Sequence, residues 1–117
     1  MDNNMVGGKI MKIMKPWGYE IIIAHTDRYA GKILHIKAGE ETSLHYHAKK
    51  RETIYLYKGV IKVETQNKTE ILKTGKAIEI LPGVLHREKA IIESELIEVS
   101  APEIDDIVRV EDKYGRG

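Results

Sequence analysis

The sequence predicts an all-β fold, a sandwich or barrel of short strands. Runs rich in β-branched residues recur along most of the chain, and turn-forming residues separate them at regular intervals. Helical periodicity is weak everywhere except over residues 102–110, where we expect a turn or two of helix. At 117 residues the chain is long enough for one packed core, so we expect a single domain.

The expected strands follow one another with Gly, Pro or Asn in the turns between them. They cover residues 20–24, 32–37, 42–47, 52–58, 60–65, 69–73, 77–81, 89–93 and 95–100. The run 60–65 has the clearest alternation, because Ile61 and Val63 alternate with charged residues. Side chains point to opposite faces with period two, so this strand should bury the Ile61 and Val63 face.

Composition limits the classes of partner. The formal net charge is +1, which gives no electrostatic signature for nucleic acid or for a membrane surface, and we expect neither as a partner. The chain has no cysteine, which excludes disulfides and thiolate ligands. The N-terminus mixes Asp2, Asn3, Asn4 and Lys9 where a signal peptide would need an apolar core, so we expect a cytoplasmic protein.

The most informative segment runs from Gly39 to Gly59. If it is extended, His45 and His47 project from the same face of a strand, and Glu52 begins the next strand. His86 follows the Pro-Gly turn at 82–83 and is the candidate for a fourth ligand. Imidazole and carboxylate ligands suit one divalent transition metal, and the residue types leave Zn, Mn, Fe, Co and Ni open.

The spacing of this segment, G-x5-H-x-H-x4-E-x6-G, resembles the first signature of the cupin superfamily and matches it at every position. Residues 75–90 are similar to the second signature, G-x5-P-x-G-x2-H-x3-N, with Leu81 in place of the proline and Ala90 in place of the asparagine. The resemblance implies a double-stranded β-helix, the jelly-roll barrel of cupins. It also implies a metal inside the barrel, held by His45, His47, Glu52 and His86.

The two ends of the chain resemble the type II phosphomannose isomerase-like group of cupins. The matching segments are Lys-Pro-Trp-Gly-Tyr-Glu at 15–20 and the acidic run that ends Tyr-Gly-Arg at 105–116. Many larger fused enzymes of that group carry glutamine where this chain has His45. The resemblance implies a metal-dependent sugar or sugar-phosphate isomerase, like mannose-6-phosphate isomerase. A metal-dependent cupin dioxygenase and a non-catalytic cupin that binds a small ligand remain as alternatives.

Several residues outside the ligand set are candidates for contact with a small-molecule substrate. The catalytic base is unknown, and His35 is a candidate because histidines with altered pKa gather at functional sites. Arg109, Tyr114 and Arg116 can hold the phosphate of a sugar phosphate, or they can pair within the tail and fix it to the barrel. The charged run 49–51 is expected to be a solvated hairpin loop, with guidance of a phosphorylated substrate as the alternative.

Domain limits and assembly complete the expectations. We divide the chain into an N-terminal arm (1–14), a cupin barrel (15–101) and a C-terminal tail that packs on the barrel (102–117). Tyr55 and Tyr57 have the parity opposite to Glu52, so they should face outward. Outward aromatic residues predict a homodimer, although the N-terminal strand of the same chain can also cover them.

Overall fold

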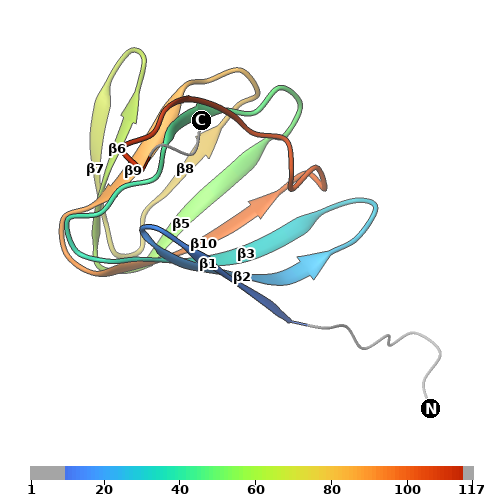
Figure 1. Ribbon diagram of the computed structural model, residues 1–117, viewed down its shortest axis with the longest axis horizontal. Coiled ribbons are helices and arrows are strands. Elements are labelled where there is room, and N and C mark those ends of the chain that lie inside the picture. The colour runs from blue at the N-terminus through green and yellow to red at the C-terminus, as the bar shows by residue number, and fades with distance from the viewer. Residues whose placement is uncertain (1–9, 115–117) are drawn as a thin grey trace.

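The computed structural model describes residues 10–114, which form eleven strands in two antiparallel sheets (Figure 1). The six-stranded sheet has the order β1-β2-β3-β10-β5-β8, and the five-stranded sheet has the order β11-β4-β9-β6-β7. The strands are β1 (Met11–Lys15), β2 (Gly18–His25), β3 (Ala30–Ile36), β4 (Leu44–Tyr46), β5 (Glu52–Lys58), β6 (Val60–Thr65), β7 (Thr69–Lys73), β8 (Ala77–Ile80), β9 (His86–Ala90), β10 (Ser94–Ser100) and β11 (Val108–Glu111).

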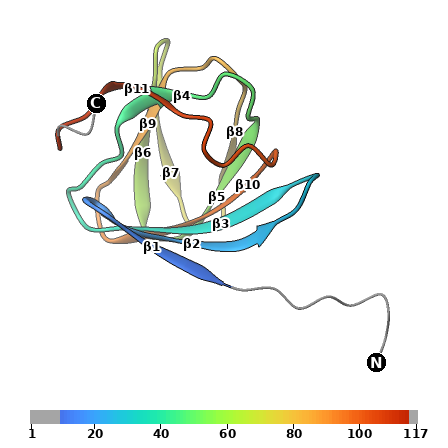
Figure 2. The ribbon, with the colours of Figure 1, turned by 45° about the vertical axis from the view of Figure 1, so that its right-hand side comes forward.

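The two sheets lie face to face, as Figure 2 shows, and the chain alternates between them. From β3 to β6 each strand belongs to the opposite sheet from the strand before it, and the same holds from β8 to β11. This alternation closes the sheets into a jelly roll. The predicted all-β double-stranded β-helix is therefore confirmed.

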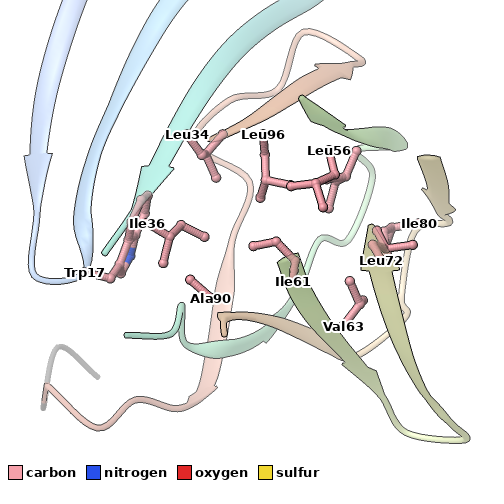
Figure 3. Close-up of a cluster of buried hydrophobic side chains, with 11 residues drawn as sticks. Trp17, Leu34, Ile36, Leu56, Ile61, Val63, Leu72, Ile80, Ala90 and Leu96 are labelled. Atoms are coloured by element: carbon pink, nitrogen blue, oxygen red, sulfur yellow. The ribbon is translucent and has the colours of Figure 1, made fainter. Parts of the chain in front are cut away.

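The apolar core lies between the two sheets (Figure 3). It combines inward side chains of both sheets, with Trp17 at its edge. Its fully buried members are Ile36, Ile54, Leu56, Ile61, Val63 and Leu96. The predicted inward face of Ile61 and Val63 is confirmed, since their exposed fractions are 0% and 1%. Tyr55 and Tyr57 face outward as predicted, with 39% and 59% of their surfaces exposed.

The structure differs from the sequence prediction at both ends of the chain. The expected helical turn at 102–110 is wrong, because residues 10–114 contain no helix and the tail instead forms β11, which pairs with β4. Strand β1 was not expected and pairs with β2, so the predicted limit between arm and barrel at residue 15 falls inside a strand. Strand β9 begins at His86, three residues before its predicted start, because its inward residues are polar and hid the alternation.

We predict that alanine at Gly59 destabilises the fold more than alanine at Gly75. Both glycines have left-handed backbones, with φ of 107° and 91°, so either substitution costs about 1 kcal/mol of strain. A Cβ at Gly59 would also collide with the Ser94 side chain and lie 2.7 Å from the Glu93 carbonyl oxygen, whereas Gly75 has open space. The collision should add roughly 1–3 kcal/mol. Urea unfolding of both variants measures the difference, and equal free energies of unfolding would contradict it.

Candidate metal centre

The four predicted ligands come together inside the barrel, next to the apolar core. His45 lies on β4 and is paired in register with His86 on β9, while Glu52 begins β5 in the facing sheet. His45, His47, Glu52 and His86 are all buried, with exposed fractions of 7%, 5%, 2% and 0%. Ligand atoms of the three histidines lie within 4.8 Å of one another. The sequence spacing therefore identified side chains that the fold brings into one cluster.

Each histidine is fixed through the same ring nitrogen. Nδ1 of His45 lies 2.8 Å from the Ser43 carbonyl oxygen, and Nδ1 of His86 lies 2.9 Å from the Val84 carbonyl oxygen. Nδ1 of His47 is hydrogen-bonded to the Asp106 carbonyl oxygen. A carbonyl can only accept, so every Nδ1 carries a proton, and in each neutral imidazole the lone pair that a metal needs is then on Nε2. Backbone partners that fix the tautomer in this way are typical of metal-binding histidines.

Glu52 completes the cluster from the facing sheet. Its Oε1 lies 3.2 Å from Nε2 of His47 and 3.0 Å from Nε2 of His86. Within the described residues, Glu52 Oε2 and His86 Nε2 are buried and make no hydrogen bond of acceptable geometry. Their nearest contacts are ionic, with Lys50 Nζ 3.5 Å from Glu52 Oε2 and Glu52 Oε1 3.0 Å from His86 Nε2. Buried polar atoms without well-aligned hydrogen bonds are costly, and a divalent cation would satisfy both. The donor set of imidazole and carboxylate thus fits a transition metal, and its identity stays open.

The protein sets opposite protonation preferences for two of the imidazoles. Burial, helped by the neighbouring His86, lowers the pKa of His45 to about 3. Burial also acts against a charged His86, but the adjacent Glu52 carboxylate and the Glu88 charge outweigh it and raise the pKa of His86 to about 9. Burial disfavours ionised Glu52 too, yet its bonds to His47 and His86 hold its pKa well below the usual range. The cluster therefore holds an ionised Glu52 and a proton on His86, and a bound cation can displace that proton.

Asp106 connects the tail to this cluster. Its carboxylate accepts hydrogen bonds from the backbone N–H groups of Ala48, Lys49 and Lys50, at 3.1, 2.7 and 2.9 Å. Its own carbonyl oxygen binds His47. One tail residue thus positions a ligand and the loop that follows it. Asp106 is absent from the predicted site because its contacts are with residues 56 or more positions away, and the local sequence does not predict them.

Two buried glutamates near the ligands were also missed. Glu88 is buried, accepts a hydrogen bond from Thr42 at 2.9 Å, and forms a possible ligand group with Glu52 and His86. Glu98 is buried on β10, where burial and the Glu52 charge raise its pKa to about 8. Strand parity could have found both, since Glu88 shares a face with His86 and Glu98 shares one with Leu96.

The prediction of a solvated loop at 49–51 is wrong for its middle residue. Lys50 is 3% exposed, and its Nζ lies 3.5 Å from Glu52 and 3.4 Å from Glu98. Lys49 and Arg51 are exposed as expected. Lys50 turns inward because the buried carboxylates offer it two partners.

A cavity of about 430 Å³ opens beside the cluster. Its lining combines His45 and His47 with residues of β1, β2, β3, the 102–107 segment and β11. Arg109 lies in this lining, paired in register with His45, and its Nε is buried without a hydrogen-bond partner in the part of the chain that the structure describes. A volume of this size accommodates a small metabolite.

The other predicted site residues lie elsewhere. His35 lies on the outward side of β3, stacked on Tyr19 and within 3.1 Å of Glu93, and is not in the cavity lining. Tyr114 donates a hydrogen bond of 2.6 Å to Glu40 and packs on the core, which agrees with a tail fixed to the barrel. Arg116 lies outside the described residues. The roles of His35, Tyr114 and Arg116 in the site stay predictions.

Comparison with known sequences finds a matching family model and similar guanylyltransferase and xanthan biosynthesis proteins. Residues 3–112 match the family model described as "Mannose-6-phosphate isomerase C-terminal". The chain is 34% identical over 110 residues to mannose-1-phosphate guanylyltransferase of Salmonella montevideo, covering 90% of this chain and 23% of that protein. It is also 34% identical to the xanthan biosynthesis protein XanB of Xanthomonas campestris, covering 90% and 24%. The chain thus spans about a quarter of the length of these relatives.

Comparison with solved structures confirms the cupin fold. An RmlC-like cupin from Shewanella frigidimarina superposes with a TM-score of 0.76 at 17% identity, covering 91% of this chain and 96% of that one. A variant of oxalate decarboxylase from Bacillus subtilis gives 0.78 at 17% identity, covering 86% and 30%. Salicylate 1,2-dioxygenase from Pseudoaminobacter salicylatoxidans gives 0.70 at 16% identity, covering 76% and 26%. At these identities the likeness concerns the fold alone.

We predict that Asp106→Ala weakens metal binding. The substitution removes the acceptor of three backbone N–H groups, so the loop after His47 loses its fixed position. Residues that orient a ligand typically change metal affinity by about 10- to 100-fold. Titration with Zn²⁺ in competition with a chelator measures the affinity. Asp105→Ala, which removes the adjacent exposed carboxylate, is the control, and equal affinities of the two variants would contradict the role given to Asp106.

We also predict that metal binding releases a proton near neutral pH. His86 is protonated below its pKa of about 9, whereas a ligand imidazole must be neutral, so a cation displaces about one proton from His86. The apparent affinity should therefore fall by about tenfold for each pH unit below that pKa. Calorimetric Zn²⁺ titrations at pH 7 in buffers of different ionisation enthalpy count the proton. Identical enthalpies in all buffers would contradict the assignment.

Proposed function

Because this chain belongs to the family described as "Mannose-6-phosphate isomerase C-terminal", we propose that it is a metal-dependent isomerase of a sugar or sugar phosphate. The observation that carries the proposal is the buried cluster of His45, His47, Glu52 and His86 beside a cavity of metabolite size. Since the chain spans only about a quarter of its guanylyltransferase relative, the activity of that whole protein is not transferred to it.

The chain's own residues supply the framework for this reaction. The three Nε2 atoms and the Glu52 carboxylate would hold one divalent transition metal, with Zn, Mn, Fe, Co and Ni as candidates. Such a metal, when bound, polarises a carbonyl or hydroxyl oxygen of the substrate as a Lewis acid. Arg109, whose Nε has no partner among the described residues, is positioned to donate a hydrogen bond to an oxygen atom of a ligand in the cavity. The surrounding strands exclude bulk water from the buried imidazoles.

We predict that the metal-loaded protein interconverts mannose 6-phosphate and fructose 6-phosphate. Incubation in deuterated water followed by NMR detects both conversion and exchange of the C2 proton with solvent. His47→Ala should abolish both signals, because it removes a ligand and leaves the apolar core intact. His25→Ala is the matched control, since it removes an exposed imidazole outside the cavity lining. The absence of both conversion and proton exchange across a panel of sugar phosphates would reject the isomerase.

Two alternatives keep the metal cluster or the cavity with a different role. The shared fold with salicylate 1,2-dioxygenase supports a comparison with metal-dependent cupin dioxygenases. Iron in protein purified without added metal, together with substrate-dependent oxygen uptake, would favour that class over the isomerase. A non-catalytic cupin would bind the sugar phosphate without converting it, so calorimetry on the same panel separates binding from turnover.

Assembly and location are further parts of the proposal. The outward Tyr55 and Tyr57 support a homodimer through the face of the six-stranded sheet. Residues 10–114 contain no helix long and apolar enough to cross a membrane. We propose a cytoplasmic protein whose partners are a small-molecule substrate and a second copy of itself.

A further inference from the structure

The wall of the cavity formed by β1, β2 and β3 carries charged residues that the metal cluster does not use. Glu20 on β2 and Lys32 on β3 face inward and are only 8% and 7% exposed. Lys15 at the end of β1 joins them, and all three residues line the cavity. Figure 2 shows β1–β3 on the opposite side of the barrel from β4 and β11. Two walls of one cavity therefore carry separate polar groups.

The charges on this wall do not balance. Lys32 Nζ lies 3.6 Å and Lys15 Nζ lies 3.9 Å from the same atom, Oε1 of Glu20. Neither ammonium group makes a hydrogen bond within the described part of the chain. Glu98 lies opposite Lys32 in the sheet, but its carboxylate is held by Lys50 at 3.4 Å. One carboxylate thus serves two ammonium groups, which is an excess of one positive charge among these three residues.

A positive charge held inside a protein is stable only when an anion compensates it. On β3 the next two inward residues, Leu34 and Ile36, join the apolar core, so Lys32 is the charged member of that inward row. The chemistry that fits two nearby ammonium groups is an oxyanion, a phosphate monoester or a carboxylate. Glu20 Oε2 can accept a hydrogen bond from a hydroxyl group of the same ligand.

We propose that Lys32 and Lys15, held by Glu20, form an oxyanion subsite for the ligand whose other end reaches the metal cluster. The inference deepens the proposed function and rests on it only for the metal-bound end of the ligand. It also gives a role to Lys15, the first residue of the Lys-Pro-Trp-Gly segment. The ligand class is a sugar phosphate or a sugar acid, bound with its anionic group on β1–β3.

Two substitutions that change the charge of the cavity wall in opposite directions test the subsite. Lys32→Met removes the ammonium group with little change of volume and should weaken the binding of inorganic phosphate to the metal-free protein by about tenfold or more. Glu20→Gln removes the competing carboxylate and should tighten the same binding. A merely structural role of the pair would weaken binding in both variants. Lys37→Met, which removes an exposed ammonium group just after β3, is the matched control and should bind phosphate as the unchanged protein does.

Calorimetry with metal-loaded protein then separates the two sources of the anion. Mannose 6-phosphate, mannuronate and neutral mannose are compared, and Lys32→Met should weaken only the anionic ligands while bound metal stays constant. The tighter of the two anions identifies phosphate or carboxylate as the ligand group. Unchanged anion affinity in Lys32→Met, an equal loss for neutral mannose, or no anion binding to the unchanged protein overturns the subsite. Lysine-dependent binding without any isomerisation would instead reject the proposed reaction and retain the subsite.

Discussion

The buried carboxylate of Glu52 is the constraint on which much of this structure depends. It begins β5 at 2% exposure, and a carboxylate in such a position needs compensating charge and hydrogen-bond donors. Imidazoles from the facing sheet and the ammonium group of Lys50 supply them, with His86 at 3.0 Å. Asp106 of the tail accepts a hydrogen bond from the Lys50 backbone N–H and so helps to fix the loop that carries Lys50. The interactions that compensate the Glu52 charge therefore connect the two sheets and the C-terminal segment.

The same strand alternation builds both the apolar core and the charged cavity. Along the inward face of β5, Glu52 is followed by Ile54 and Leu56, and along β10 Leu96 is followed by Glu98. Strand β3 follows the same rule, because Lys32 precedes Leu34 and Ile36. Each of these three strands thus carries apolar and charged side chains at separate positions along its inward face. The core holds the strands in register, and that register sets the positions of the charged groups.

Local patterns predicted what depends on local sequence. The spacing from His45 to Glu52 is readable because a strand, a turn and a second strand follow directly along the chain. Lys50, Glu98 and Asp106 were not identified, since their contacts join segments that only the completed topology brings together. The edge strands β1 and β11 were also missed, because an edge strand with one exposed face shows little apolar alternation. The helical turn expected in the tail failed because pairing with β4 outweighs a weak local preference.

The placement of different polar groups on the two walls of the cavity would determine the orientation of a bound ligand. A ligand with a single anionic group has one favourable orientation, with that group near Lys32 and its oxygen-rich remainder near His45 and His47. Contacts to the anion lie away from the reacting carbon, so they bind substrate and transition state about equally. Their value to a reaction is positional, because they fix which oxygen meets the metal cluster. A cavity with only the metal cluster would bind the same groups without that choice of orientation.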